Sequence, residues 1–169
     1  VTVAVSFVKE EQEPLPFTDV SDSDWYADEV RYVYENKTMN GVTDTEFGPN
    51  MPTTRGMIVT ILYRLENEPA VSAACPFGDV KTGSYYEKAI IWAADNGIVF
   101  GYSDTEFGPD NNITREQMAA ILYRYCRYKQ YDVSVGEDTN ILSYTDAFEV
   151  SEYAIAAMQW ACGAGLIEG

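Results

Sequence analysis

Two threonine-arginine pairs, 60 residues apart, are the residues of this sequence best suited to bind a ligand. Thr54 precedes Arg55, and Thr114 precedes Arg115, each pair at the predicted start of a helix that ends near residue 66 or 128. A positive charge at a helix N-terminus opposes the helix dipole and costs up to about 1 kcal/mol. Each arginine therefore requires a compensating partner.

Two kinds of partner suit these arginines. One is a loop carboxylate, Asp44 for Arg55 and Asp104 for Arg115, which would form an ion pair. The other is an anionic ligand, because a guanidinium and the free backbone N–H groups of a helix N-terminus together form an anion-binding corner. Both arrangements hold at once if the aspartate orients the guanidinium.

The two helix starts differ in their capping residues. Thr114 and Gln117 have the spacing of a capping box, in which the threonine accepts from the backbone three residues on and the glutamine reaches back to the cap. In the other pair Met57 replaces the glutamine, so we expect the helix after Thr54 to begin less rigidly.

These pairs belong to a duplicated unit. Residues 41–65 and 101–125 align without a gap, and each copy is predicted to be a helix, an ordered loop and a second helix. A weaker third copy follows, in which Trp160 matches Trp92 at an offset of 68 residues, and it stops before its loop and its Thr-Arg helix.

The repeats divide the chain as follows. Residues 1–8 alternate apolar and polar side chains, which predicts a short N-terminal β-strand, and a charged, proline-containing linker follows to residue 16. We interpret 1–16 as the end of a preceding domain, 17–71 and 75–131 as two complete repeats, and 132–169 as a connector with an incomplete third. We therefore expect the chain to be a piece of a longer protein.

Composition excludes several function classes. Of 169 residues 46% are hydrophobic, and 27 acidic against 11 basic residues give a net charge of −16, which disfavours nucleic acid as a partner. No apolar run is long enough to enter a membrane. There is no histidine, and the three cysteines form no CxxC motif, so no catalytic triad, metal site or cofactor is indicated. One cysteine pair could bridge, with Cys126 and Cys162 the better candidates.

The acidic residues near the first helix resemble a calcium loop only loosely. Asp19, Asp22 and Asp24 lack the spacing of an EF-hand and its terminal glutamate. A solvated cap and turn is the stronger interpretation.

Aromatic residues fall into two classes. Those on helical stripes are predicted to be core: Tyr63, Tyr123, Trp92 and Trp160. Trp25 with Tyr26, and Tyr85 with Tyr86, stand at helix starts, where one of each pair is expected to be buried and the other is suited to stack on a sugar ring.

Together these motifs resemble the S-layer homology (SLH) domain family. The resemblance rests on F-x-D-V, an aromatic pair at a helix start, N-G at its end, a G-x-x-D-T-x-F-x-P loop and T-R opening a second helix, and it covers residues 17–169. It implies a mainly α fold of three tandem helix-loop-helix repeats, arranged as a pseudo-threefold, three-pronged spindle around a three-helix bundle.

The resemblance also implies a function. SLH modules are non-catalytic anchors that hold extracellular proteins on the wall of bacteria with a Gram-positive-type envelope. They bind a secondary cell-wall polysaccharide carrying pyruvate ketals in grooves between repeats. Carried onto this sequence, the family's ligand-binding positions are Arg55, Arg115, Thr54, Thr114, Trp25, Tyr85, Gly41, Gly101, Tyr102 and Asp104.

This sequence departs from the family pattern in places. Neither Thr-Arg motif has the family's glutamate at its fourth position, where Met57 and Gln117 stand, and Val42 replaces the aromatic residue found as Tyr102, so the first groove is the weaker candidate. Two other functions are compatible with the repeats: a protein interaction or self-association module that assembles a surface layer without binding glycan, and a glycoside hydrolase. The hydrolase is disfavoured because no pair of carboxylates is singled out.

Overall fold

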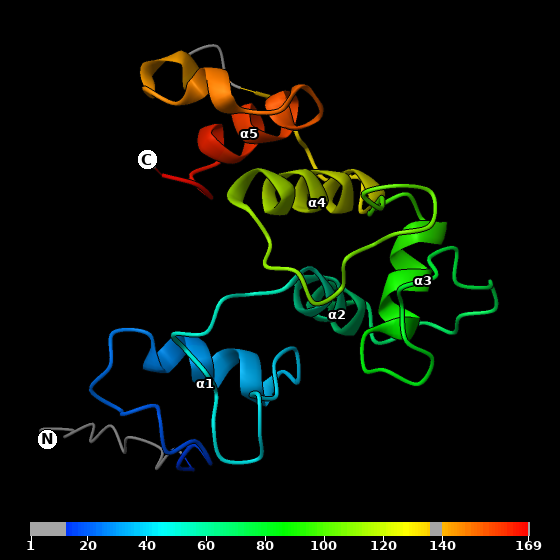
Figure 1. Cartoon of the computed structure of the whole chain (residues 1–169). Coiled ribbons are helices and arrows are strands. Elements are labelled where there is room, and N and C mark those ends of the chain that lie inside the picture. Colours follow the sequence, from blue (N-terminus) through cyan, green and yellow to red (C-terminus); the bar gives the residue numbers. More distant parts are fainter. Residues whose placement is uncertain (1–12, 136–139, 169) are drawn as a thin grey trace, which may run out of the picture. The chain divides into compact units, whose positions relative to one another are not determined.

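The computed structural model describes residues 13–135 and 140–168, and this part of the chain is mainly helical, as predicted (Figure 1). The predicted strand at 1–8 lies outside the described residues. Within them, extended pairing is limited to one antiparallel bridge between Thr54 and Asn112. The α-helices are α1 (Ala27–Glu35), α2 (Arg55–Leu65), α3 (Glu87–Asp95), α4 (Arg115–Tyr128) and α5 (Ile155–Gly163), and three short 3₁₀ helices lie before α5: η1 (Ile141–Ser143), η2 (Ala147–Glu149) and η3 (Glu152–Ala154).

The chain forms two compact units, Val1–Met51 and Pro52–Gly169, which are described separately. The first unit holds α1 and the loop of copy one. Phe17 is buried at its centre and contacts the rings of Tyr34 and Phe47 at centroid distances of 5.0 and 5.3 Å. The boundary between the units falls inside the first sequence repeat, between its loop and α2.

Helix limits follow the sequence closely for α2 and α4 and less closely for α1. Thr54 and Thr114 are the N-caps, and their hydroxyls accept from the backbone N–H three residues on. The sequence places the pair Trp25 and Tyr26 at a helix start, and α1 begins directly after this pair, at Ala27, without a side-chain cap. Asp24 instead accepts from the backbone N–H of Ser21 at 2.8 Å and closes the preceding turn.

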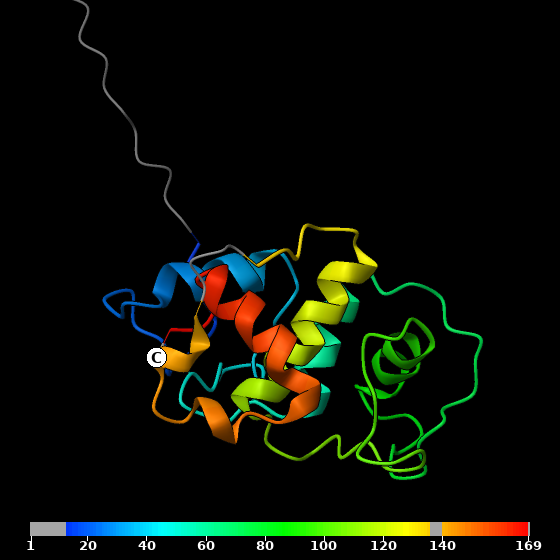
Figure 2. The same cartoon turned by 90° about the horizontal axis from the view of Figure 1, so that it is seen from above.

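In the second unit each helix that follows a Thr-Arg pair packs on the first helix of the next copy. α2 contacts α3, and α4 contacts α5, which both views show alongside it (Figures 1 and 2). The larger cluster contains Val59, Leu62, Tyr63, Ile90, Trp92 and Phe107, and a smaller one contains Ala119, Ala120, Ala157, Trp160 and Ala161. The core assignments of Tyr63, Trp92 and Trp160 are confirmed, and Tyr123 packs half-buried at the edge of the smaller cluster.

A polar contact also joins α2 to α4. Glu66, the C-cap of α2, accepts from the hydroxyl of Tyr125 at 2.6 Å and lies 2.9 Å from the ammonium of Lys129. The hydrogen bond from Tyr125 and the partner Lys129 hold the pKa of Glu66 below its usual value. This contact fixes the C-terminal ends of the two helices against each other.

The aspartate of each F-x-D-V motif clamps the loop of its own copy. Asp79 accepts from the backbone N–H groups of Phe107 (2.9 Å) and Gly108 (2.7 Å), and Asp19 does the same for Phe47 and Gly48, both at 2.8 Å. The interpretation of Asp19 as part of a solvated cap and turn is therefore wrong. It is a loop clamp that neither the calcium motif nor the cap interpretation anticipated.

The three cysteines are free thiols, so the bridge between Cys126 and Cys162 is not formed. Both pack against the α4 and α5 cluster, and burial raises the pKa of Cys126. Among the described helices, none has the length and apolar character required to cross a membrane.

We predict that Asp79→Asn lowers the free energy of unfolding by about 1–2 kcal/mol at neutral pH, measured by urea denaturation, because an amide cannot accept both loop hydrogen bonds. Burial by itself would raise the pKa of Asp79, but the bonds from Phe107 and Gly108 outweigh it and bring the pKa below its ordinary 3.8. A lowered folded-state pKa stabilises above 3.8, and this stabilisation is lost as the pH falls through the folded-state value.

The gap between wild type and Asp79→Asn should therefore close in acid. Asp104→Asn, in the same loop and exposed, is the control and should unfold like wild type at neutral pH. A gap that persists unchanged in acid would contradict the clamp.

Candidate functional site

Arg55 is buried in the second unit, with only 5% of its surface exposed. Its Nε–H donates to the carbonyl of Phe107 at 2.9 Å, one terminal nitrogen donates to the carbonyl of Phe100 at 2.9 Å, and the other lies 3.4 Å from Oε1 of Gln117. The guanidinium carbon is also 4.6 Å from the ring centroid of Tyr102 and 4.5 Å from that of Phe107. Its hydrogen bonds and ring contacts therefore come from copy two.

The N-terminus of α2 is likewise occupied by the loop of copy two. The backbone N–H of Arg55 donates to the carbonyl of Asn111 (3.0 Å), and that of Gly56 donates to Pro109 (2.8 Å). A Cβ at residue 56 would meet the Pro109 carbonyl at 2.9 Å and the ring of Tyr86 at 3.0 Å. Glycine at this position lets the loop approach, and the corner around Arg55 is filled by protein.

The two loop glycines predicted to line grooves have structural reasons of their own. Gly41 has a φ of +83°, and at Gly101 a Cβ would lie 2.3 and 2.4 Å from two loop carbonyl oxygens. Any larger residue would force each loop open.

Arg115 has a different environment from Arg55. Its side chain is exposed, and one terminal nitrogen donates to the carbonyl of Glu168 at 3.1 Å. This bond is the counterpart of the bond from Arg55 to Phe100 in the preceding copy. A guanidinium has five N–H donors. Four of those on Arg115 have no hydrogen-bond partner among residues 13–135 and 140–168.

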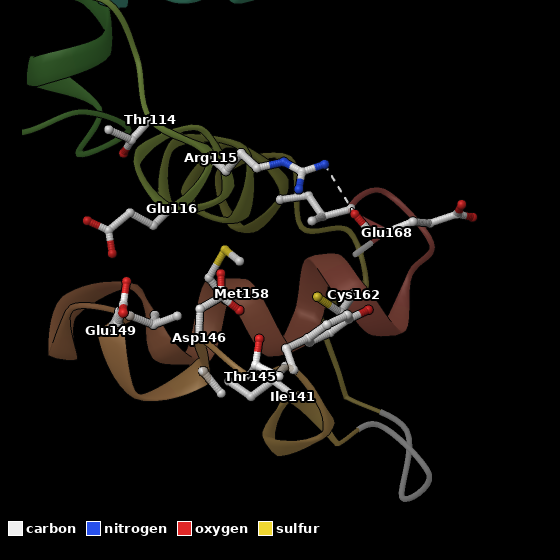
Figure 3. A pocket seen from close by; sticks show the side chains of 14 residues that line it. Thr114, Arg115, Glu116, Ile141, Thr145, Asp146, Glu149, Met158, Cys162 and Glu168 are labelled. Carbon is white, nitrogen blue, oxygen red and sulfur yellow. Dashed lines mark hydrogen bonds between the residues drawn. The ribbon is translucent and has the colours of Figure 1, made fainter.

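A cavity of about 500 Å³ lies at this arginine, between the start of α4 and the segment from η1 to α5. Figure 3 shows Arg115 on one wall, with Met158 and Cys162 of α5 facing it. Both helix-start residues of copy two line this cavity, so the structure brings Thr114 and Arg115 to one open site. The lining residues are Thr114, Arg115, Glu116, Ile141, Tyr144, Thr145, Asp146, Ala147, Glu149, Val150, Met158, Cys162, Ile167 and Glu168.

Carboxylates also line the cavity, and one is already engaged. Glu116 accepts from the backbone N–H of Ser151 (2.9 Å), from the hydroxyl of Ser151 (3.1 Å) and from the hydroxyl of Tyr153 (3.1 Å). Burial and this bond to Glu116 raise the pKa of Tyr153 to about 12, so its hydroxyl stays protonated at neutral pH. Asp146, Glu149 and Glu168 carry the remaining negative charge of the lining.

Neither arginine has the loop aspartate that the sequence suggested as its partner. Ion pairs with Asp44 or Asp104 are not formed: ion pairs within the described residues involve Arg31, Arg64 and Lys129. Backbone carbonyls take the place of the carboxylates. Gln117 turns to Arg55 where a reciprocal capping bond was expected, because that arginine requires a third acceptor.

The predicted stacking residues are exposed. Trp25 is 87% exposed and Tyr85 57%, and each meets its neighbour edge to face, at centroid distances of 5.3 and 4.9 Å. Tyr86 is buried, as expected of one member of each pair. Trp25 and Gly41 belong to the first unit, whereas Tyr85, Gly101, Tyr102 and Asp104 belong to the second.

Sequence reasoning missed the roles of Glu116, Gln117 and Asp146. Glu116 stands where copy one has Gly56. This difference between the aligned copies could have indicated that Glu116 has a role of its own. Asp146 aligns with the clamp residues Asp19 and Asp79, so alignment of the F-x-D-V motifs could have identified it.

A comparison with protein families matches the S-layer homology domain at residues 16–56 and 76–119, half of the chain. Three relatives illustrate the range of similar proteins. An endoglucanase of Bacillus sp. (strain KSM-635) is 36% identical over 92% of this chain. A surface-layer 125 kDa protein of Lysinibacillus sphaericus is 33% identical over 64%, and a cellulosome-anchoring protein of Acetivibrio thermocellus is 29% identical over 75%.

The chain spans only a small part of each relative. It covers 16% of the endoglucanase, 10% of the surface-layer protein and 29% of the cellulosome-anchoring protein. The similarity therefore concerns one segment of these proteins.

We predict that Arg55→Ala lowers the free energy of unfolding by about 2–4 kcal/mol, because it leaves the buried carbonyl of Phe107 and the partly buried carbonyl of Phe100 without this donor. The matched change Arg115→Ala should cost less than about 1 kcal/mol, since its single bond is exposed to water. Urea denaturation of both variants measures the difference. Equal costs would show that burial of Arg55 does not stabilise the unit.

Proposed function

The chain belongs to the S-layer homology domain family, and from that membership we propose that it is a non-catalytic module which anchors a larger protein to the bacterial cell wall. The cellulosome-anchoring and surface-layer relatives support this role by their names. The endoglucanase matches over only 16% of its length, so we assign its catalytic activity to other parts of that protein. The module would act outside the cell, at the cell surface.

We propose further that the ligand is an anionic secondary cell-wall polysaccharide, with a carboxylate such as that of a pyruvate ketal as the recognised group. The exposed guanidinium of Arg115 beside a cavity of about 500 Å³ is the observation that carries this proposal. Its four unused N–H donors suit a carboxylate, which accepts two parallel hydrogen bonds from a guanidinium. Thr114 at the same cavity supplies a further hydroxyl.

Of the two Thr-Arg corners, the second is the better ligand site. At Arg55 the carbonyls of copy two already accept from the guanidinium, and the amides at the start of α2 are bonded to the loop. A ligand would have to displace that loop. We therefore assign Arg55 a positioning role, in which it holds the loop that carries Tyr102 and Asp104.

The remaining residues that the family resemblance implies are proposed to line the sugar-binding surface. Trp25 and Tyr85 would stack on sugar rings, since both are exposed. Gly41 and Gly101 would contribute through the loop shape that only glycine permits.

The net charge of −16 opposes an anionic ligand at long range. At physiological ionic strength this field is screened beyond about 8 Å, whereas a guanidinium acts on a carboxylate in direct contact. Asp146 and Glu149 line the same cavity as Arg115 and should weaken anion binding there. Variants that change single charges at the cavity therefore test whether the ligand binds there.

We predict that Arg115→Gln reduces sedimentation of the chain with purified wall sacculi by tenfold or more, about the effect of one charged hydrogen bond pair. Binding should need the secondary polymer, and added salt should weaken it. Arg127→Gln on the exposed side of α4 is the control of equal charge. Undiminished binding by Arg115→Gln would reject the assignment of this arginine.

We also predict that Asp146→Asn strengthens binding to the same sacculi by a few fold, because it removes a negative charge that lines the cavity. Asp132→Asn, a change of equal charge outside the cavity, should bind like wild type. A loss of affinity in Asp146→Asn would indicate that this carboxylate binds the ligand directly.

The second candidate is self-association into a surface layer without glycan binding. The almost fully exposed rings of Trp25 and Phe148 favour it, because large exposed aromatic side chains are enriched at protein interfaces. Light scattering across a range of protein concentrations separates the candidates. A mass that rises with concentration, together with absence of binding to the polymer, would favour this role.

A further inference from the structure

A second arginine on α4, Arg124, lies outside the Arg115 cavity and has no carboxylate partner in the described part of the chain. The ion pairs there join Arg31 to Asp22, Arg64 to Glu68 and Lys129 to Glu66. Arg64 is the copy-one counterpart of Arg124 and has its glutamate four residues on, at 3.8 Å. At the equivalent place copy two has Tyr128, so Arg124 lacks this neutralising group.

The surroundings of Arg124 are aromatic and positively charged. Its guanidinium carbon is 4.7 Å from the ring centroid of Phe100, and that ring is 59% exposed. The carbonyl of Phe100 accepts from Arg55, so two guanidinium groups meet at one residue. Burial lowers the pKa of Arg124, and the charge of Arg55 lowers it further.

Two partly desolvated like charges repel each other, and a bound anion would relieve that repulsion. The polar groups close by do not supply the anion. Tyr153 acts on both arginines, but its hydroxyl stays protonated at neutral pH because its pKa is about 12. Glu116 lies nearby and already accepts three hydrogen bonds from Ser151 and Tyr153.

We name the group formed by Phe100, Tyr102, Tyr153 and the partly buried Arg124 the Arg124 surface. Each of its three rings is about half exposed or more, and all four residues belong to the second unit. Aromatic faces beside a guanidinium suit a sugar acid, because the C–H face of a pyranose ring stacks on an aromatic ring while its carboxylate meets the cation.

This surface is separate from the Arg115 cavity. The two arginines are nine positions apart along α4, which is about 14 Å of helix axis and about half a turn of rotation beyond two full turns. They therefore leave α4 on opposite faces. Gln117 lies seven residues before Arg124, on the same face of α4, and it contacts Arg55. Ala119 lies four residues after Arg115, on the other face, and it packs with α5.

We propose that the Arg124 surface is a second binding subsite for an acidic sugar residue, with the carboxylate on Arg124 and the sugar ring on the uncovered part of Phe100. The proposal rests on the proposed function, because it assigns the same wall polysaccharide two contacts on one chain. Two subsites on opposite faces of α4 would let one chain engage two segments of a polymer and gain avidity.

The test follows each arginine by NMR in the whole chain. A methyl glycoside that carries a carboxyl-bearing pyruvate ketal is titrated into protein with ¹⁵N-labelled arginine side chains, and the Nε–H signals of Arg115 and Arg124 are assigned from the Arg115→Gln and Arg124→Gln variants. We expect both signals to shift and saturate, and the Arg124 signal to shift equally in Arg115→Gln. The signal of Arg127 should not move.

Each outcome has a distinct meaning. A saturating shift of Arg115 with none at Arg124 overturns the second subsite and leaves the proposed function intact. No shift at either arginine, together with no binding to the polymer, overturns the proposed function and the subsite with it. A saturating shift of Arg124 that the neutral methyl ester of the same glycoside reproduces would overturn carboxylate recognition at this subsite.

A polymer measurement then checks the avidity. Arg124→Gln and Phe100→Ala should each weaken sedimentation with polymer-bearing sacculi by about tenfold, and Arg127→Gln should not. The thermal unfolding transition, followed by circular dichroism, must match wild type for Arg124→Gln. Wild-type sedimentation by a folded Arg124→Gln variant would reject the second contact.

Discussion

The burial of one guanidinium without a carboxylate governs the packing of the second unit. Arg55 keeps its charge only because the carbonyls of Phe100 and Phe107 accept from it at 2.9 Å and aromatic rings cover its faces. A buried charge that lost these acceptors would be strongly destabilising. The loop of copy two must therefore keep its shape, which the clamp of Asp79 and the bare backbone of Gly101 maintain.

The same sequence motif reaches two different states within one chain. After Arg55, Gly56 lets the loop carbonyl of Pro109 approach the start of α2, and the corner is filled. After Arg115, Glu116 reaches across to Ser151 and Tyr153, and a cavity remains beside the arginine. A filled corner stabilises the repeat array, whereas an open corner offers donors to a ligand. We propose that structural and binding roles are thereby distributed between the copies.

Charge distribution, more than total charge, decides what such a module can bind. The chain carries −16, yet Arg124 and Arg55 lie close together, with Tyr153 beside them and no ion pair of their own among the described residues. Copy two has Tyr128 where copy one has Glu68 beside Arg64, and this single difference leaves Arg124 without that carboxylate. A partly desolvated cation in contact with an anion interacts with it more strongly than many distant, hydrated carboxylates do, because water and salt screen those carboxylates.

By itself the sequence determined the duplicated units, the capping threonines, the limits of α2 and α4 and the burial of Tyr63, Trp92 and Trp160, because these depend on local periodicity and on contacts repeated in each copy. Only the tertiary structure decided that Arg55 is enclosed and Arg115 open, that Gln117 serves Arg55, and that Asp19 and Asp79 clamp loops. The partners of Arg55 lie 45 to 62 residues away in the sequence. Local patterns do not specify which distant carbonyl or side chain fills a corner, because that depends on how one copy packs on the next.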